Sequence, residues 1–130
     1  MLVATEPEFI PAPPEIREQL DRFAEEHKDD PMGGVGGRMI FEDERVRMWE
    51  LILEPGAASD LHHHDCDYYL IVFEGDLVAG VPPKDSGIEP FMVPIPETGN
   101  IVMIPGGATE WALNVGKKTY REMIVELKNS

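Results

Sequence analysis

Three of the four histidines in this chain of 130 residues stand together, as His62, His63 and His64. They precede the apolar run YYLIVF, which is typical of a buried strand. Because side chains alternate on an extended backbone, His62 and His64 point the same way, together with Tyr68. Two imidazoles side by side are a candidate metal site, although histidines in a protein interior are also often hydrogen-bonded core residues. If they are ligands, a carboxylate is expected to complete the set.

The residues around this pair have less specific interpretations. His63 has the opposite parity and is expected to face outward, as a surface or interface residue. Asp65 and Asp67 are expected to be surface carboxylates, with metal ligation or support of an imidazole as the alternative. Cys66, the single cysteine, cannot form an internal disulfide. We expect it to pack in the interior, with ligation of a soft metal as a minor alternative.

The elements that would position these residues are a helix followed by strands. Ile16, Leu20 and Phe23 recur at helical spacing, so residues 15–27 are expected to form an amphipathic helix. From residue 38 the pattern changes to period two with frequent turns, which is typical of an antiparallel sandwich or barrel. The expected strands cover residues 38–41, 45–53, 68–73, 77–81, 91–95, 100–104, 110–114 and 119–127. The chain thus divides into an N-terminal arm with a helix, 1–37, and a β domain, 38–130.

Three shorter segments refine this expected architecture. Residues 33–38, GGVGGR, lack the Gly-Lys-Ser/Thr of a phosphate-binding loop and are expected to be a flexible or close-packed loop. Residues 74–76 are expected to close a hairpin between strands 68–73 and 77–81. The last expected strand has the alternation of a half-buried strand: Met123, Val125 and Leu127 alternate with Glu122, Ile124 and Glu126.

Composition excludes several classes of partner. The formal net charge is −14, from 25 acidic and 11 basic side chains, and such a field repels nucleic acids and acidic membrane surfaces. No apolar run approaches the roughly 18–20 residues of a membrane helix. The first residues lack the basic start and apolar core of a signal peptide. We therefore expect a cytoplasmic protein; the acidic charge favours cations and neutral small molecules only mildly and does not itself identify a ligand.

The spacing around the histidines resembles the first motif of the cupin superfamily. That motif consists of Gly, five residues, His-x-His, three or four residues, Glu, six residues and Gly. The chain reproduces this spacing with Gly56, His62, His64, Tyr68 and Gly75. Tyr68 therefore stands where the family has its glutamate.

A second stretch resembles the second cupin motif. That motif consists of Gly, five residues, Pro-x-Gly, two residues, His, three residues and Asn. The chain reproduces it with Gly99, Pro105, Gly107, Glu110 and Asn114, so that Glu110 stands where the family has its histidine. The two motifs span residues 56–114, and the strand pattern extends the resemblance to most of residues 38–127.

The resemblance implies a fold, a ligand set and an oligomeric state. The implied fold is all-β, an antiparallel jelly-roll β-barrel with one N-terminal α-helix, and family members often form homodimers. Cupins typically offer three histidines and one glutamate to a divalent metal. At the matching positions this chain offers His62, His64 and Glu110, which is the ligand count of the two-histidine, one-carboxylate sites of iron and of several zinc sites. The alternative for Glu110 is a glutamate at the mouth of the barrel in contact with water.

The resemblance also implies a range of functions. A site of His62, His64 and Glu110 would hold Fe, Mn, Zn or Ni, with Tyr68 and Glu110 as the candidate catalytic residues. The expected activity is that of a dioxygenase, or of a metal-assisted isomerase or lyase, on a small organic molecule. One alternative is a non-catalytic sensor or carrier, in which Tyr68 merely fills the barrel. Another is a metal-free enzyme in which Glu110 and a histidine move a proton.

Overall fold

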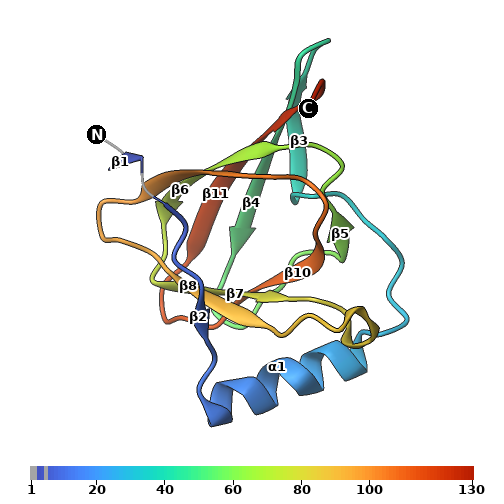
Figure 1. The fold of residues 1–130 in the computed structure, drawn as a ribbon. Coiled ribbons are helices and arrows are strands. Elements are labelled where there is room, and N and C mark those ends of the chain that lie inside the picture. Colours follow the sequence, from blue (N-terminus) through green and yellow to red (C-terminus); the bar gives the residue numbers. More distant parts are fainter. Residues whose placement is uncertain (1–2, 5) are drawn as a thin grey trace.

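The computed structural model describes residues 3–4 and 6–130, which form two packed β-sheets with a helix on the outside (Figure 1). The six-stranded sheet has, in order, β1 (Val3–Ala4), β9 (Asn100–Ile104), β6 (Tyr68–Glu74), β11 (Tyr120–Leu127), β4 (Val46–Leu53) and β3 (Arg38–Glu42). The five-stranded sheet has β2 (Ile10–Pro11), β8 (Phe91–Pro94), β7 (Leu77–Val81), β10 (Thr109–Asn114) and β5 (His62–His63). The paired strands are antiparallel except β1 and β9. The expected antiparallel β fold with one N-terminal α-helix is confirmed.

The N-terminal segment attaches to the barrel at several points. Helix α1 (Pro14–Glu26) begins at a proline, which is preorganised for the first turn of a helix. Its Leu20 and Ala24 are buried in one cluster with Trp111. Strands β1 and β2 extend the two sheets at their edges, and the boundary expected at residue 37 falls in the loop that leads to β3. No helix in the described part of the chain is both long and apolar enough to cross a membrane.

The turn at residues 74–76 does not close the expected hairpin. Strand β6 pairs with β9 and β11, whereas β7 pairs with β8 and β10 in the other sheet. Gly75 at this crossing has a φ of 143°, and a Cβ atom there would lie 2.9 Å from Cδ2 of Tyr120. The prediction was wrong because local spacing indicates a tight turn but does not reveal which sheet the next strand joins.

The outer face of the six-stranded sheet carries exposed apolar side chains. Tyr69 stands opposite Met103 and Val125, and Met48 stands opposite Val125 and Phe41. These residues form one row across five strands, with Met103, Tyr69 and Phe41 each more than 40% exposed. Large exposed apolar patches are typical of interaction surfaces. The homodimer remains a prediction.

Candidate metal centre

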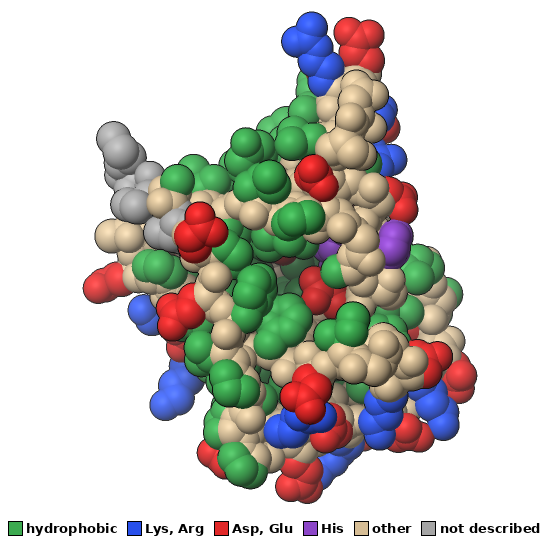
Figure 2. All heavy atoms as spheres, in the orientation of Figure 1, with side chains coloured by type: hydrophobic (Ala, Val, Ile, Leu, Met, Phe, Trp, Pro, Cys, Tyr) green, Lys and Arg blue, Asp and Glu red, His purple; other side chains and the backbone are tan. Residues whose placement is uncertain are grey.

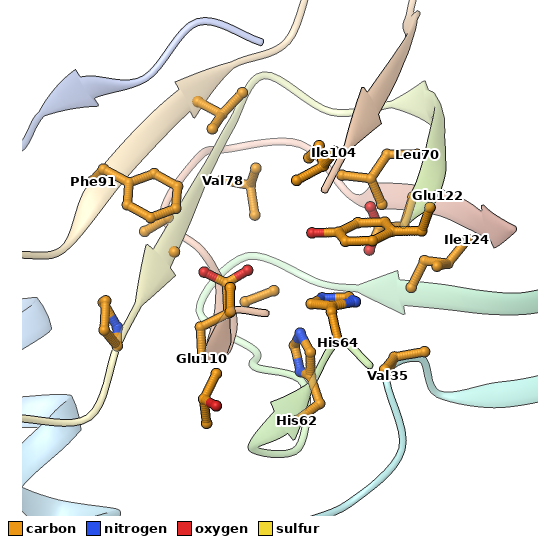
Figure 3. A pocket seen from close by; sticks show the side chains of 18 of the residues that line it. Val35, His62, His64, Leu70, Val78, Phe91, Ile104, Glu110, Glu122 and Ile124 are labelled. Carbon is orange, nitrogen blue, oxygen red and sulfur yellow. The ribbon is translucent and has the colours of Figure 1, made fainter. Parts of the chain in front are cut away.

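The register of two neighbouring strands brings the predicted ligands together. Strands β5 and β10 are antiparallel, and Glu110 stands directly opposite His62, so their side chains lie on the same face. His64 continues this pairing beyond β5, because its backbone N–H donates to the carbonyl of Ala108 over 2.9 Å. One ligand atom from each of His62, His64 and Glu110 lies within 4.8 Å of the others. Figure 3 shows the three side chains beside one another at the cavity. The group could therefore hold a metal ion.

The His62 imidazole is held in a fixed orientation. Its Nδ1 lies 2.9 Å from the backbone carbonyl oxygen of Asp60. Because a carbonyl can only accept a hydrogen bond, Nδ1 carries the proton and Nε2 keeps its lone pair. The side chain is buried, and burial lowers its pKa. A neutral imidazole with an oriented free nitrogen fits a metal ligand.

His64 is also kept neutral. Burial, with smaller contributions from His62 and His63, lowers its pKa to about 3. Its ring stacks on Tyr68, with centroids 3.9 Å apart. Its buried Nδ1 has no hydrogen-bond partner among the described residues, which is costly in a protein interior. This unpaired ring nitrogen fits a site that a further atom, such as a metal ion, would complete.

Glu110 is a half-buried carboxylate with no compensating cation. Within the described residues, no hydrogen bond or ion pair reaches its side chain, and burial raises its pKa to about 7. A buried negative charge is stable only when it is paired or neutralised. Two neutral imidazoles and one such carboxylate match the donors that Fe, Mn, Zn and Ni accept.

These donors border a cavity of about 340 Å³ between the two sheets. A volume of this size is at the small end of ligand pockets. Its walls are mainly apolar, with side chains that include Leu70, Val78, Phe91, Val93, Ile104 and Ile124. Figure 2 shows the molecule hollowed between apolar side chains on this face. The shape and lining suit a small, mostly apolar molecule.

The structure places the remaining predicted residues in different positions. Tyr68 is buried and lines the cavity, and burial raises the pKa of its phenol, so the hydroxyl stays protonated at neutral pH. His63 has a side chain 40% exposed and lies 2.7 Å from the Thr109 hydroxyl. Asp67 accepts a hydrogen bond from the N–H of Gly106. Neither His63 nor Asp67 lines the cavity.

Sequence reasoning did not single out Glu122, although it also faces the cavity. Glu122 lies on β11 and is 5% exposed. Its Oε2 accepts a hydrogen bond of 2.6 Å from the Tyr120 hydroxyl. The sequence pattern that could have identified Glu122 was the alternation of apolar and acidic side chains in the last strand. The structure buries the side that carries Glu122, Ile124 and Glu126, whereas hydropathy alone favours burial of the opposite side.

Comparison with known proteins establishes the fold. A cupin domain from Bordetella pertussis Tohama I matches with a TM-score of 0.58 and 18% identity, over 73% of this chain and 98% of its own. An RmlC-like cupin family protein with a double-stranded β-helix fold, from Methanocaldococcus jannaschii, matches with a TM-score of 0.55 and 19% identity, over 69% of this chain and 76% of its own. Neither a protein-family model nor a curated protein matches the chain. The chain has the fold of the cupin superfamily, which confirms the resemblance at the level of the fold.

Proposed function

We propose that the protein is a divalent-metal-dependent enzyme that acts on a small organic molecule. The observation that carries the proposal is the convergence of His62, His64 and Glu110 at the wall of a cavity. Because fold alone says little about function, the proposal rests on this site. The activity we propose is that of a dioxygenase with iron, or of an isomerase or lyase with manganese, zinc or nickel.

The residues of the chain have separate roles in this proposal. A bound ion would supply Lewis-acid chemistry, or redox chemistry in the case of iron. The Asp60 carbonyl keeps His62 in the tautomer that ligation needs. The walls of the cavity are mainly apolar, so a bound substrate would displace water from it and strengthen the electrostatic interactions there. Tyr68 keeps its proton and would donate a hydrogen bond to an oxygen atom of the substrate.

Metal analysis of untagged protein tests the proposal, since a histidine tag would add ligands of its own. Metal-free protein is dialysed against Fe(II), Mn(II), Zn(II) or Ni(II), and the bound metal is measured by mass spectrometry. We expect about one equivalent for at least one ion, as a single three-ligand site requires. His62→Ala and Glu110→Ala should each abolish this binding.

His63→Ala is the matched control, because His63 is the neighbouring imidazole and faces away from the cavity. It should retain the full equivalent of metal. If the unmodified protein binds well under one equivalent of all four ions, the proposed enzyme is wrong. The non-catalytic sensor or carrier then becomes the better interpretation, in agreement with the two ligand positions at which the chain departs from the cupin motifs.

A further inference from the structure

A second carboxyl group enters the cavity from the wall opposite to Glu110. Glu110 lies on β10 of the five-stranded sheet, whereas Glu122 lies on β11 of the six-stranded sheet. Both line the cavity, and Figure 3 shows them on different walls. Glu122 does not belong to the group of three candidate ligands. It therefore needs a separate explanation.

The surroundings of Glu122 use only one of its oxygens. Oε2 accepts the hydrogen bond from Tyr120, whose hydroxyl is its sole hydrogen-bond partner within the described chain. Oε1 remains available, and a carboxylate can accept about four hydrogen bonds in all. A side chain that is 5% exposed and only partly hydrogen-bonded is unusual. It suits a group that a bound ligand completes.

The charge of the cavity restricts the ligand. No lysine or arginine from the described residues lines it, and burial keeps His62 and His64 neutral. The titratable groups that face Glu122 are Tyr120 on its own strand, Tyr68 on β6 and Glu110 on β10, and none of them is a cation. An anion near Glu122 would meet a like charge with nothing to offset it. A hydroxyl or ammonium group would instead find an acceptor.

We propose that Glu122, positioned by Tyr120, is a ligand-recognition group that binds a hydroxyl or ammonium group of a mostly apolar molecule and excludes molecules that carry an anion at that end. This recognition point deepens the proposed function, in which the other end of the same molecule lies at the metal. It does not require the metal, because it lies on the other sheet. The two proposals can therefore fail separately.

Three probes that share a phenyl ring and a two-carbon arm test the recognition point: 2-phenylethylamine, 2-phenylethanol and phenylacetate. Binding is measured by nuclear magnetic resonance titration at pH 8, with metal-free and with Zn(II)-treated protein. At this pH, about one unit above the value of about 7 to which burial raises the pKa of Glu122, the ionised carboxylate is the main form. The amine should bind more tightly than the alcohol, and phenylacetate should not bind to the metal-free protein. Glu122→Gln should lower the affinity for the amine about tenfold, because a charge-assisted hydrogen bond is lost. It should lower the affinity for the alcohol about threefold or less.

Two further variants decide the outcome. Glu126→Gln removes another buried carboxylate from the same face of β11, but Glu126 pairs with Arg47 outside the cavity, so the order of the three probes should not change. Glu110→Gln should leave the amine preferred. The proposal is overturned if phenylacetate binds the metal-free protein as tightly as the amine. It is equally overturned if the preference for the amine survives Glu122→Gln but is lost in Glu110→Gln. If the protein does not bind metal but the order of the three probes is as expected, only the proposed metal-dependent enzyme is overturned.

Discussion

Two glutamates reach the same cavity from opposite sheets, and their surroundings differ. Glu110 stands opposite His62 and has no hydrogen-bond or ion-pair partner in the described chain. Glu122 is more deeply buried and accepts a hydrogen bond of 2.6 Å from Tyr120. Burial raises the pKa of each carboxyl to about 7. Similar acidities thus arise in two different kinds of site.

The difference lies in what each carboxylate still requires. Glu110 lies beside two neutral imidazoles, so a divalent cation would satisfy all three groups at once. Glu122 already has one hydroxyl donor and an oxygen still available, so a further hydrogen-bond donor, such as a hydroxyl or ammonium group, satisfies it better than a metal ion does. The position and the hydrogen-bond partners of each carboxylate, more than its pKa, distinguish the candidate metal ligand Glu110 from the candidate substrate-binding residue Glu122.

The largest expected effect separates the two glutamates by metal affinity. Glu110→Gln should lower the affinity for Zn(II) at least about 100-fold, because changes to the outer shell of a metal site alone cost about 10–100-fold. Glu122→Gln should change it less than about threefold, because Glu122 lies outside the three-residue group. Competition with a chromophoric chelator measures both. Equal losses in the two variants would show that both carboxylates bind the ion, and the distinction would fail.

The next effect is the pH dependence of metal binding. Burial lowers the pKa of both imidazoles, that of His64 to about 3, and raises that of Glu110 to about 7, so just below pH 7 Glu110 is the ligand that holds a proton. Metal binding must displace this proton. Affinity for Zn(II) should therefore fall about tenfold per pH unit below pH 7 and level off above it. A chelator competition series from pH 5.5 to 8 checks this. A flat profile would mean that Glu110 is already ionised or is not a ligand.

Much of the candidate metal site was predictable from the sequence. The parity of His62 and His64 placed both on one side of an extended backbone, and the spacing of the second motif placed Glu110 at the matching position. The structure pairs Glu110 with His62 in neighbouring strands, a register that the motif spacing did not itself specify. Their role as ligands remains a prediction, as does the catalytic role of Tyr68.

The other wall of the cavity was not predictable in the same way. Alternation along β11 defines two faces, but it does not say which face the barrel encloses. The apolar side of the strand, with Met123 and Val125, lies on the outer face of the sheet, and the side with Glu122 lies inside. Likewise, the wrong hairpin at residues 74–76 arose because sheet membership depends on contacts far along the chain. Both errors concern tertiary arrangement, which local patterns do not encode.

A smaller effect distinguishes Glu122 by stability in the metal-free protein. Its pKa is about 7 in the folded state against an ordinary value of 4.5. The folded state therefore binds this proton more tightly than the unfolded state does. The stability that protonation of Glu122 contributes is fully present below pH 4.5 and is lost as the pH rises to about 7. Glu122→Gln mimics the protonated form. At pH 8 it should stabilise the metal-free protein by ~1–3 kcal/mol, and at pH 4.5 it should have little effect.

Thermal unfolding at the two pH values measures this difference. Glu126→Gln is the control on the same strand face. Glu126 forms an ion pair of 2.7 Å with Arg47, so its loss should destabilise the protein at pH 8. Destabilisation by Glu122→Gln at pH 8 would mean that the carboxylate has a cationic partner that the described contacts do not contain.

The smallest effect concerns the hydroxyl that holds Glu122. Tyr120→Phe removes one hydrogen bond and leaves the ring, which packs with Leu51 and Val72 between the sheets. Because this bond favours the ionised carboxyl, its loss should raise the pKa of Glu122 further above 7. The variant should also lose about 1 kcal/mol of stability. A carbon-13 carboxyl titration by nuclear magnetic resonance follows Glu122 and Glu110 together. A comparable rise for Glu110 would mean that the two glutamates respond as one site, whereas a rise confined to Glu122 supports two separate sites in one cavity.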